Sequence, residues 1–204
     1  MVNANSKGTE ATYHSRLLKA LSDNLEEINR GTRIIAENLL ACHNSRGNVW
    51  LIGNGGSAST AEHFETDLSF LRQKKENAFL NVTALSSNSS LITAASNDIS
   101  FESVYKTILE KKAKEGDLLI SISASGNSLN ILESISFAKS IGVKTMSLLG
   151  FDGGRVALMS DETILVRTQI GDYGITEDIH LSICHASSAL FFEFIDTLRD
   201  RNLL

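Results

Sequence analysis

The chain has 204 residues, a net charge of −5 from 19 basic and 24 acidic residues, and two cysteines. This length favours a single domain with a sizeable core, and the absence of a basic cluster argues against nucleic acid as a partner. The polar N-terminus and the absence of an apolar run near the ~18 residues of a membrane helix lead us to expect a cytoplasmic protein without membrane contact. We interpret Cys42 and Cys184 as buried free thiols, because both lie in helical patterns.

The N-terminal part of the chain predicts a tail followed by a long helix. Residues 1–12 are polar, and we predict a mobile tail there. Leucine and isoleucine then recur at a helical period over residues 13–42. This helix is long for one that only covers a sheet. It therefore suits an oligomer contact, although packing on its own domain explains the pattern equally well.

Short apolar runs after this helix predict buried strands. They span residues 49–52, 78–85, 118–123, 143–149 and 163–166. Helical patterns separate most of these runs, and residues 175–199 predict a long terminal helix. Strands that alternate with helices in this way indicate an α/β layered fold with a mainly parallel sheet. No linker-like composition divides residues 13–204, so we expect a single domain.

A glycine turn with hydroxyl residues follows the first of these strands. Gly53, Gly55 and Gly56 remove Cβ atoms from the turn, so backbone can pass close to a ligand. Ser57 and Thr60 stand at the start of the next helix, where free N–H groups and the helix dipole suit a phosphate. The turn matches neither a Walker P-loop nor the dinucleotide fingerprint.

The strand at 118–123 is followed by a similar loop, in which Ser123, Ser125 and Ser128 accompany Gly126. Carboxyl ends of parallel strands are where open α/β sheets bind ligands. One loop of this kind would be explained most simply as a capped turn. Two of them favour a phosphate site.

Acid/base residues lie on two of the predicted helices. His63 and Asp67 are spaced i, i+4 on one helical face, and His185 shares a face with Glu177 on the terminal helix. Together they resemble a metal set of two histidines and two carboxylates. A lone histidine on such a helix is more commonly structural or on the surface, so spacing alone leaves both readings open. With the glycine turn, the pair indicates a sugar-phosphate site.

Several motifs, in order along the chain, resemble the sugar isomerase (SIS) domain, and within it the sedoheptulose 7-phosphate isomerases, or phosphoheptose isomerases. The motifs that carry this resemblance are Gly53-Asn54-Gly55-Gly56-Ser57, Ala61-Glu62-His63-Phe64, Asn97-Asp98, Ile122 to Ser128, the 150–154 loop, and Ile179-His180 with His185. The resemblance covers essentially residues 13–199. It implies a three-layer αβα sandwich with a five-stranded parallel sheet, and an N-terminal helix that takes part in oligomerisation.

The resemblance also implies a function. The expected enzyme is an aldose–ketose isomerase that converts sedoheptulose 7-phosphate to D-glycero-D-manno-heptose 7-phosphate, for the heptose of lipopolysaccharide, capsule or other surface polysaccharide. The expected form is a homotetramer with active sites at subunit interfaces and one zinc per subunit.

Matching this chain to the family's motifs assigns a role to each site residue. Asp67 and His185 match the catalytic pair, and His63, Asp67, Glu177 and His185 match the metal ligands. The substrate-binding positions are Asn54, Gly55, Gly56, Ser57, Asn97, Asp98, Ser123, Ala124, Ser125, Ser128 and Glu177.

The chain departs from the family pattern at three places. Asp67 stands where the family has a glutamate, and Glu177 stands where it has a glutamine. Gly174 and Ile175 replace an aspartate–arginine pair, and Asp172 is the candidate substitute for that aspartate. These departures leave open an isomerase of a related sugar phosphate. They also leave open a non-catalytic SIS protein that binds phosphosugars or assembles a replication-initiation complex. An amino-sugar phosphate enzyme fits less well, because such enzymes usually have two SIS halves.

Overall fold

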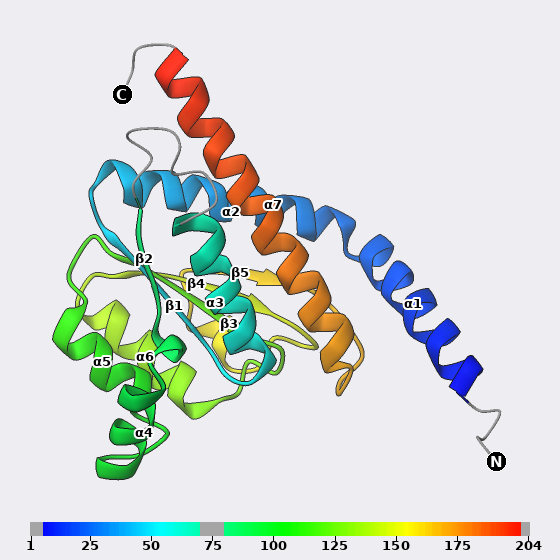
Figure 1. Cartoon of the computed structure of the whole chain (residues 1–204), viewed down its shortest axis with the longest axis horizontal. Helices are drawn as coiled ribbons and strands as arrows, with labels where there is room; N and C mark the ends of the chain where they lie inside the picture. Colours follow the sequence, from blue (N-terminus) through cyan, green and yellow to red (C-terminus); the bar gives the residue numbers. More distant parts are fainter. Residues whose placement is uncertain (1–5, 70–79, 201–204) are drawn as a thin grey trace.

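The central element of the structure, a computed structural model that describes residues 6–69 and 80–200, is one five-stranded sheet. Its strands are β1 (Asn48–Gly53), β2 (Asn81–Ala84), β3 (Leu118–Ser123), β4 (Lys144–Leu149) and β5 (Glu162–Leu165). They pair in the order β2-β1-β3-β4-β5, and every neighbouring pair is parallel (Figure 1). The carboxyl ends of all the strands therefore lie at one edge, where ligand-binding loops are expected.

Helices cover both faces of this sheet. They are α1 (Ser6–Asp23), α2 (Leu25–Asn44), α3 (Gly56–Ser69), α4 (Ser89–Asp98), α5 (Val104–Lys112), α6 (Leu129–Ser140) and α7 (Tyr173–Asp200), with short 3₁₀ turns at Leu85–Ser87 and Val156–Leu158. The helices α2, α3 and α7 pack on one face, whereas α5 and α6 pack on the other (Figure 1). This arrangement confirms the predicted three-layer α/β sandwich.

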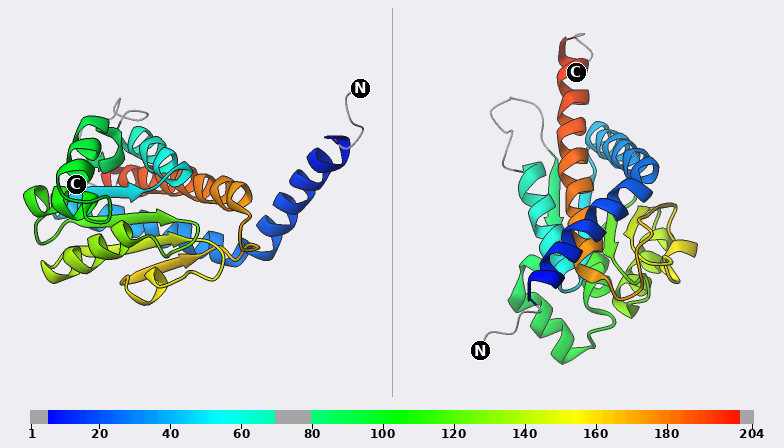
Figure 2. Two further views of the ribbon diagram at one scale, coloured as in Figure 1. Left: turned by 90° about the horizontal axis from the view of Figure 1, so that it is seen from below. Right: turned by 90° about the vertical axis from the view of Figure 1, so that its right-hand side faces the viewer.

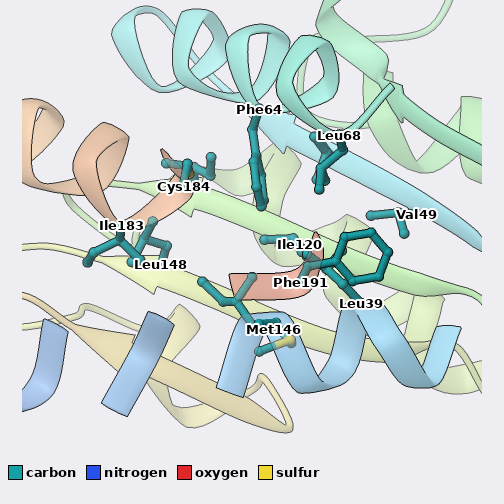
Figure 3. Packing of buried hydrophobic residues seen from close by; sticks show 14 of the residues in the cluster. Leu39, Val49, Phe64, Leu68, Ile120, Met146, Leu148, Ile183, Cys184 and Phe191 are labelled. Atoms are coloured by element: carbon teal, nitrogen blue, oxygen red, sulfur yellow. The ribbon is translucent and has the colours of Figure 1, made fainter. Parts of the chain in front are cut away.

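Each face of the sheet has its own apolar core. On the first face, Phe64 of α3, Leu39 of α2 and Phe191 of α7 converge over the strands (Figure 3). On the second face, Trp50 and Tyr105 are buried among the aliphatic residues of α5 and α6. Because the strands are buried on both faces, their sequences are almost continuously apolar, which is why they could be recognised from sequence.

The predicted N-terminal helix is longer in the structure and is divided into two helices. It begins at Ser6, so residues 6–12 of the predicted tail are helical, while residues 1–5 lie outside the described residues. It breaks at Asn24, whose side-chain amide donates to the carbonyls of Ala20 and Arg167 and accepts from the Arg167 N–H. This anchor separates α1 from α2, and α1 projects away from the rest of the molecule (Figure 2).

Two predicted boundaries also move. The second strand begins at Asn81, and the first two residues of its prediction, 78 and 79, lie outside the described residues. Asn97 and Asp98, which the family resemblance assigns to substrate binding, complete the last turn of α4. The Ser100 hydroxyl accepts from the Ser103 N–H in a local turn, and α5 begins only at Val104. A hydrogen bond between a serine hydroxyl and the backbone stabilises a turn in place of a helix, so the helix begins later in the sequence.

The terminal helix α7 is long and apolar enough to cross a membrane by length and composition alone. In this fold it is a core helix, since Ile179, Ile183 and Phe191 are fully buried against α2, α3 and the sheet. Both cysteines are buried free thiols, as predicted.

Candidate active site

Two histidines and one aspartate meet between α3 and α7. The Nε2 atoms of His63 and His185 lie 3.0 Å apart. The carboxylate of Asp67 lies 3.6 Å from the His63 Nε2 and 3.7 Å from that of His185. About half of each imidazole is exposed, whereas only 8% of the Asp67 side chain is exposed. The cluster is therefore open to solvent on the histidine side and closed behind the carboxylate.

Buried neighbours in the sequence orient these side chains. Phe64 and Leu68, each one residue after a site residue, point into the core with Cys184, which precedes His185 (Figure 3). Because those three side chains fix which face of each helix is buried, His63, Asp67 and His185 meet along the seam between α3 and α7. Burial raises the pKa of the Cys184 thiol well above its usual range, and the nearby Asp67 carboxylate raises it further. This cysteine is therefore not a nucleophile.

The cluster has the donor set that a metal such as zinc accepts. One nitrogen from each histidine and one oxygen of Asp67 all lie within 4.8 Å of one another. Two imidazole nitrogens and a carboxylate oxygen, with solvent on the remaining side, match the ligands of open zinc sites. The residues present therefore fit the expected group.

A second feature is a pocket of about 170 Å³ at the carboxyl ends of β1 and β3. Its lining residues are Asn54, Ser57, Ile122, Ser123, Ala124, Ser125, Ser128, Tyr173 and Glu177. Asn54 and Ser57 of the first predicted loop thus share one cavity with residues of the second loop, which are Ser123, Ala124, Ser125 and Ser128. Hydroxyl and amide groups dominate this list, which suits a polar ligand with several oxygens.

The loop after β3 is held in shape by its own side chains and by the loop after β4. The Ser123 hydroxyl accepts from the Gly126 N–H, and the Ser125 hydroxyl accepts from the Asn127 N–H. Gly126 has a φ of +60°, and a Cβ there would clash with the carbonyl of Gly153. Only glycine is free of strain at this position, so the tight approach of the two loops requires it.

Glu177 reaches the pocket from the second turn of α7. Its carboxyl group lies against Gly56, so close that a Cβ on Gly56 would overlap it. Burial raises the pKa of Glu177, and the neighbouring Asp178 charge raises it further. A carboxyl group therefore stands at the N-terminus of α3, where the sequence predicted an anion cradle.

Comparisons with known proteins agree with this geometry. The family model described as "SIS domain" matches residues 12–150. A probable phosphoheptose isomerase of Thermoplasma volcanium is 35% identical over 187 residues, which cover 88% of this chain and 93% of that protein. A phosphoheptose isomerase of Helicobacter pylori is 36% identical over 167 residues, which cover 82% and 85%.

The chain belongs to the SIS-domain family. Among solved structures, the phosphoheptose isomerase GmhA of Neisseria gonorrhoeae is similar with a TM-score of 0.83 and 27% identity, over 92% of this chain and 98% of that one. The phosphoheptose isomerase of Francisella tularensis has the same fold, with a TM-score of 0.82, 24% identity and coverage of 92% and 98%.

Within this SIS domain, most of the predicted site residues come together. Gly55 and Gly56 are not among the described residues that line the pocket, and two further groups also differ from the prediction. Asn97 and Asp98 lie exposed at the end of α4, where the Asn97 amide donates to the Asp98 carboxylate at 2.9 Å. Neither is among the described residues that line the pocket. Glu177 lines the pocket with the serines and is outside the group formed by the two histidines and Asp67. The structure therefore assembles three of the four predicted metal ligands.

Two residues near the substrate loops were not identified from the sequence. Tyr173 lines the pocket, and its ring makes an edge contact with Phe151 at a centroid distance of 5.1 Å. Asn130 exchanges two hydrogen bonds with Asn54. The only sequence signal for Asn130 was its place between two apolar residues in the first turn of α6. Tyr173 had no such signal.

Two further polar residues of this region lie outside the pocket. His180 is fully buried, and burial lowers its pKa to about 4 against the opposite effect of the Leu149 backbone, so its imidazole is neutral at physiological pH. Asp172, the candidate for the missing aspartate of the family, accepts from Arg16 of α1 at 3.0 Å. Neither residue is among the described residues that line the pocket.

Proposed function

We propose that this protein is a phosphoheptose isomerase, which converts sedoheptulose 7-phosphate to D-glycero-D-manno-heptose 7-phosphate. The observation that carries the proposal is the arrangement of two sites along α3. Ser57 lines the serine pocket at the start of this helix, and His63 begins the cluster six residues later. That spacing is about 9 Å along the helix axis.

This separation suits a substrate whose phosphate is remote from its carbonyl group. In sedoheptulose 7-phosphate the phosphate is on C7 and the carbonyl is C2, at opposite ends of the carbon chain. The hydroxyl-rich pocket would bind the phosphate end, and the cluster of His63, Asp67 and His185 would face the carbonyl end. A sugar with a shorter chain would reach both sites less well.

The proposed chemistry is a proton transfer through an enediol. Asp67 is the base that takes a proton from C1, and His185 donates a proton to the C2 oxygen as the enediol forms. Returning a proton to C2 and removing one from the C1 hydroxyl then yields the aldose. His63 holds the His185 imidazole through the contact between their Nε2 atoms. The low exposure of Asp67 favours a reactive carboxylate, because few water molecules solvate it.

Zinc, one per subunit, is the proposed metal. His63, Asp67 and His185 would hold it, and Glu177 would have to leave its place against Gly56 to join them. When bound, such an ion polarises substrate oxygens and organises the surrounding side chains.

We also propose an oligomeric state, a cellular location and a biosynthetic role. We expect a cytoplasmic homotetramer with active sites at subunit interfaces, which supplies heptose for surface polysaccharide and needs neither a membrane nor nucleic acid. The N-terminal segment and residues 13–204 would act as one SIS unit, with α1 as its oligomerisation arm.

The direct test is to incubate the purified chain with sedoheptulose 7-phosphate and to follow the aldose product by NMR. Fructose 6-phosphate and ribulose 5-phosphate, which carry the phosphate nearer the carbonyl, are the matched comparison substrates. Turnover of the seven-carbon ketose above that of both shorter ones supports the proposal. Binding of all three without turnover would favour a non-catalytic phosphosugar-binding protein, for which the shorter Asp67 side chain is the specific argument.

A further inference from the structure

A pair of asparagines joins the two loops that line the pocket. Asn54 follows β1, and Asn130 lies in the first turn of α6, directly after the loop that follows β3. The Asn54 Nδ2 donates to the Asn130 Oδ1 at 2.9 Å, and the Asn130 Nδ2 donates to the Asn54 Oδ1 at 2.9 Å. Two amides that exchange hydrogen bonds in this way fix each other's orientation, because flipping one of them alone would set N–H against N–H and oxygen against oxygen.

The two asparagines differ in what they can reach. Asn54 lines the pocket. Asn130 is 2% exposed and is absent from the described residues that line that pocket. The most direct route from the Asn130 side chain to a bound ligand therefore runs through Asn54.

The bonds of the pair leave Asn54 half of its hydrogen-bonding capacity. A primary amide has two N–H donors and two acceptor lone pairs, and Asn130 uses one of each. The backbone of Asn54 is also fixed, since its carbonyl accepts from the Ser57 N–H at 3.0 Å in the turn that begins α3. With both its backbone and its amide plane held, Asn54 offers one donor and one acceptor in a set direction.

We infer that Asn130 is a positioning residue for substrate recognition: through the two-bond bridge it fixes the Asn54 amide toward the sugar hydroxyls and holds the β1 and β3 loops in register around the pocket. This inference rests on the proposed function for its substrate, but the bridge itself is a property of the free protein. A sugar phosphate then meets a prearranged amide, and it does not have to order that amide on binding.

The first experiment examines the bridge without any substrate. Hydrogen exchange of the Asn54 side-chain amide is followed by NMR, with the resonances assigned by their loss in Asn54→Ala. We expect at least tenfold faster exchange in Asn130→Ala than in the wild type. The matched control is Ser134→Ala on the same helix, which removes a buried hydroxyl that donates to the Asn130 carbonyl and leaves both side-chain amides in place. Unchanged exchange in Asn130→Ala would overturn the inference.

The second experiment is a double-mutant cycle on kcat/KM for sedoheptulose 7-phosphate. Asn130→Ala should lower kcat/KM about 10- to 100-fold, because small misplacements in a site have effects of that size. In the Asn54→Ala background the same change should cost less than twofold, because the residue it acts through is gone. Ser134→Ala should lose stability but keep kcat/KM within about twofold. An equal loss from Asn130→Ala in both backgrounds would show a merely structural role and would overturn the inference.

A wild-type chain that does not turn over this ketose contradicts the proposed function and leaves the exchange experiment intact. The cycle is then measured on the dissociation constant of sedoheptulose 7-phosphate. The same non-additivity is expected there, and additive losses would count against the bridge.

Discussion

The Nε2 atoms of His63 and His185 lie 3.0 Å apart, although 122 residues separate them in the sequence. The Asp67 carboxylate lies beside both nitrogens, at 3.6 Å and 3.7 Å, which is beyond hydrogen-bond distance. Three atoms that can bind a metal are thus gathered in one place. A divalent cation would satisfy all of them at once.

The first prediction is therefore that the chain, purified without chelator, carries about one zinc. His63→Ala and His185→Ala should each reduce bound zinc to a small fraction, because two remaining ligands hold the ion poorly. The control is His14→Ala on the exposed α1 helix. Elemental analysis gives the stoichiometry. Less than a tenth of an equivalent of any divalent metal, unchanged after adding zinc, would contradict the prediction.

The second prediction concerns the loop after β3. Ser125→Ala should weaken sugar-phosphate binding by about 1–3 kcal/mol, the usual loss for a hydrogen bond to a charged group. The melting temperature should hardly change, since among the described residues the Ser125 hydroxyl has one hydrogen bond, a long one of 3.4 Å from the Asn127 N–H. Calorimetric titration measures the affinity, with Ser136→Ala on the exposed side of α6 as the control. An unchanged affinity would mean that this loop serves only to begin the helix.

The third prediction concerns the carboxyl group in the pocket. Glu177→Gln should bind sugar phosphate about fivefold more tightly at pH 8, because removing a negative charge near a phosphate is worth about 1 kcal/mol. Burial and Asp178 raise the pKa of Glu177, so its charge appears at a higher pH than that of an ordinary carboxyl group. The advantage of the variant should therefore grow as pH rises through this ionisation and vanish below it.

The measurement is the dissociation constant from pH 5 to pH 8 for the wild type and Glu177→Gln. The second ionisation of the phosphate strengthens its repulsion from the Glu177 carboxylate, so it changes the ratio in the same direction as the ionisation of Glu177. Glu193→Gln, at an exposed position farther along α7, serves as the control. Zinc content is determined for both proteins, because a lower content in Glu177→Gln would indicate that Glu177 is a metal ligand. A ratio that does not depend on pH would exclude a role of this charge in binding.

The sheet and most of the pocket could be predicted from sequence because their signals are local. Buried parallel strands are continuous apolar runs, and the serines follow such runs directly. The pairing of His63 with His185 depends on how α3 packs against α7. This pairing could be predicted only because both helices carry acid/base residues at a recognisable spacing and because their motifs resemble a known family.

The errors arose where a distant contact decides the local structure. The break at Asn24 depends on hydrogen bonds with Arg167, which lies 143 residues away. The helical periodicity of residues 13–42 does not reveal these hydrogen bonds, so it could not predict the break. The position of Glu177 likewise depends on the missing side chain of Gly56, which leaves space for a carboxyl group. Sequence spacing places Glu177 on the same helical face as His185. Along the helix axis, however, the eight positions from Glu177 to His185 correspond to a separation of about 12 Å.

The fourth prediction is oligomeric state. The helix α1 projects from the molecule (Figure 2). Leu18 on α1 is 69% exposed, and Leu25 on α2 is 56% exposed. Exposed leucines on a projecting helix suit burial against another copy of the chain. Light scattering should report a tetramer, and Leu18→Glu should shift it toward smaller species, whereas Lys19→Glu at the neighbouring exposed position should not. A stable monomer at micromolar concentration would contradict this expectation.

The last prediction concerns acid stability and the buried His180. Burial lowers the pKa of His180 to about 4, whereas in the unfolded chain it returns to about 6.5. Between these values the unfolded state binds a proton that the folded state does not, so folding stability falls as pH decreases from about 6.5 to about 4. The loss should approach about 3 kcal/mol and then level off. His180→Gln should remove this part of the pH dependence, while His14→Gln should keep it.

Urea unfolding at several pH values between 7 and 4 measures the effect as the difference between the wild type and His180→Gln. Carboxylates that lose stabilising contacts act at lower pH. Burial raises the pKa of Asp161, but hydrogen bonds from Lys139 and Thr145 outweigh it and bring the value to about 2. The pH-dependent loss of stability from such carboxylates therefore occurs mainly below pH 4, under the range in which His180 acts. It is the same in all the variants. Parallel curves for the wild type and His180→Gln from pH 7 to pH 4 would show that His180 gains its proton without unfolding the helix around it.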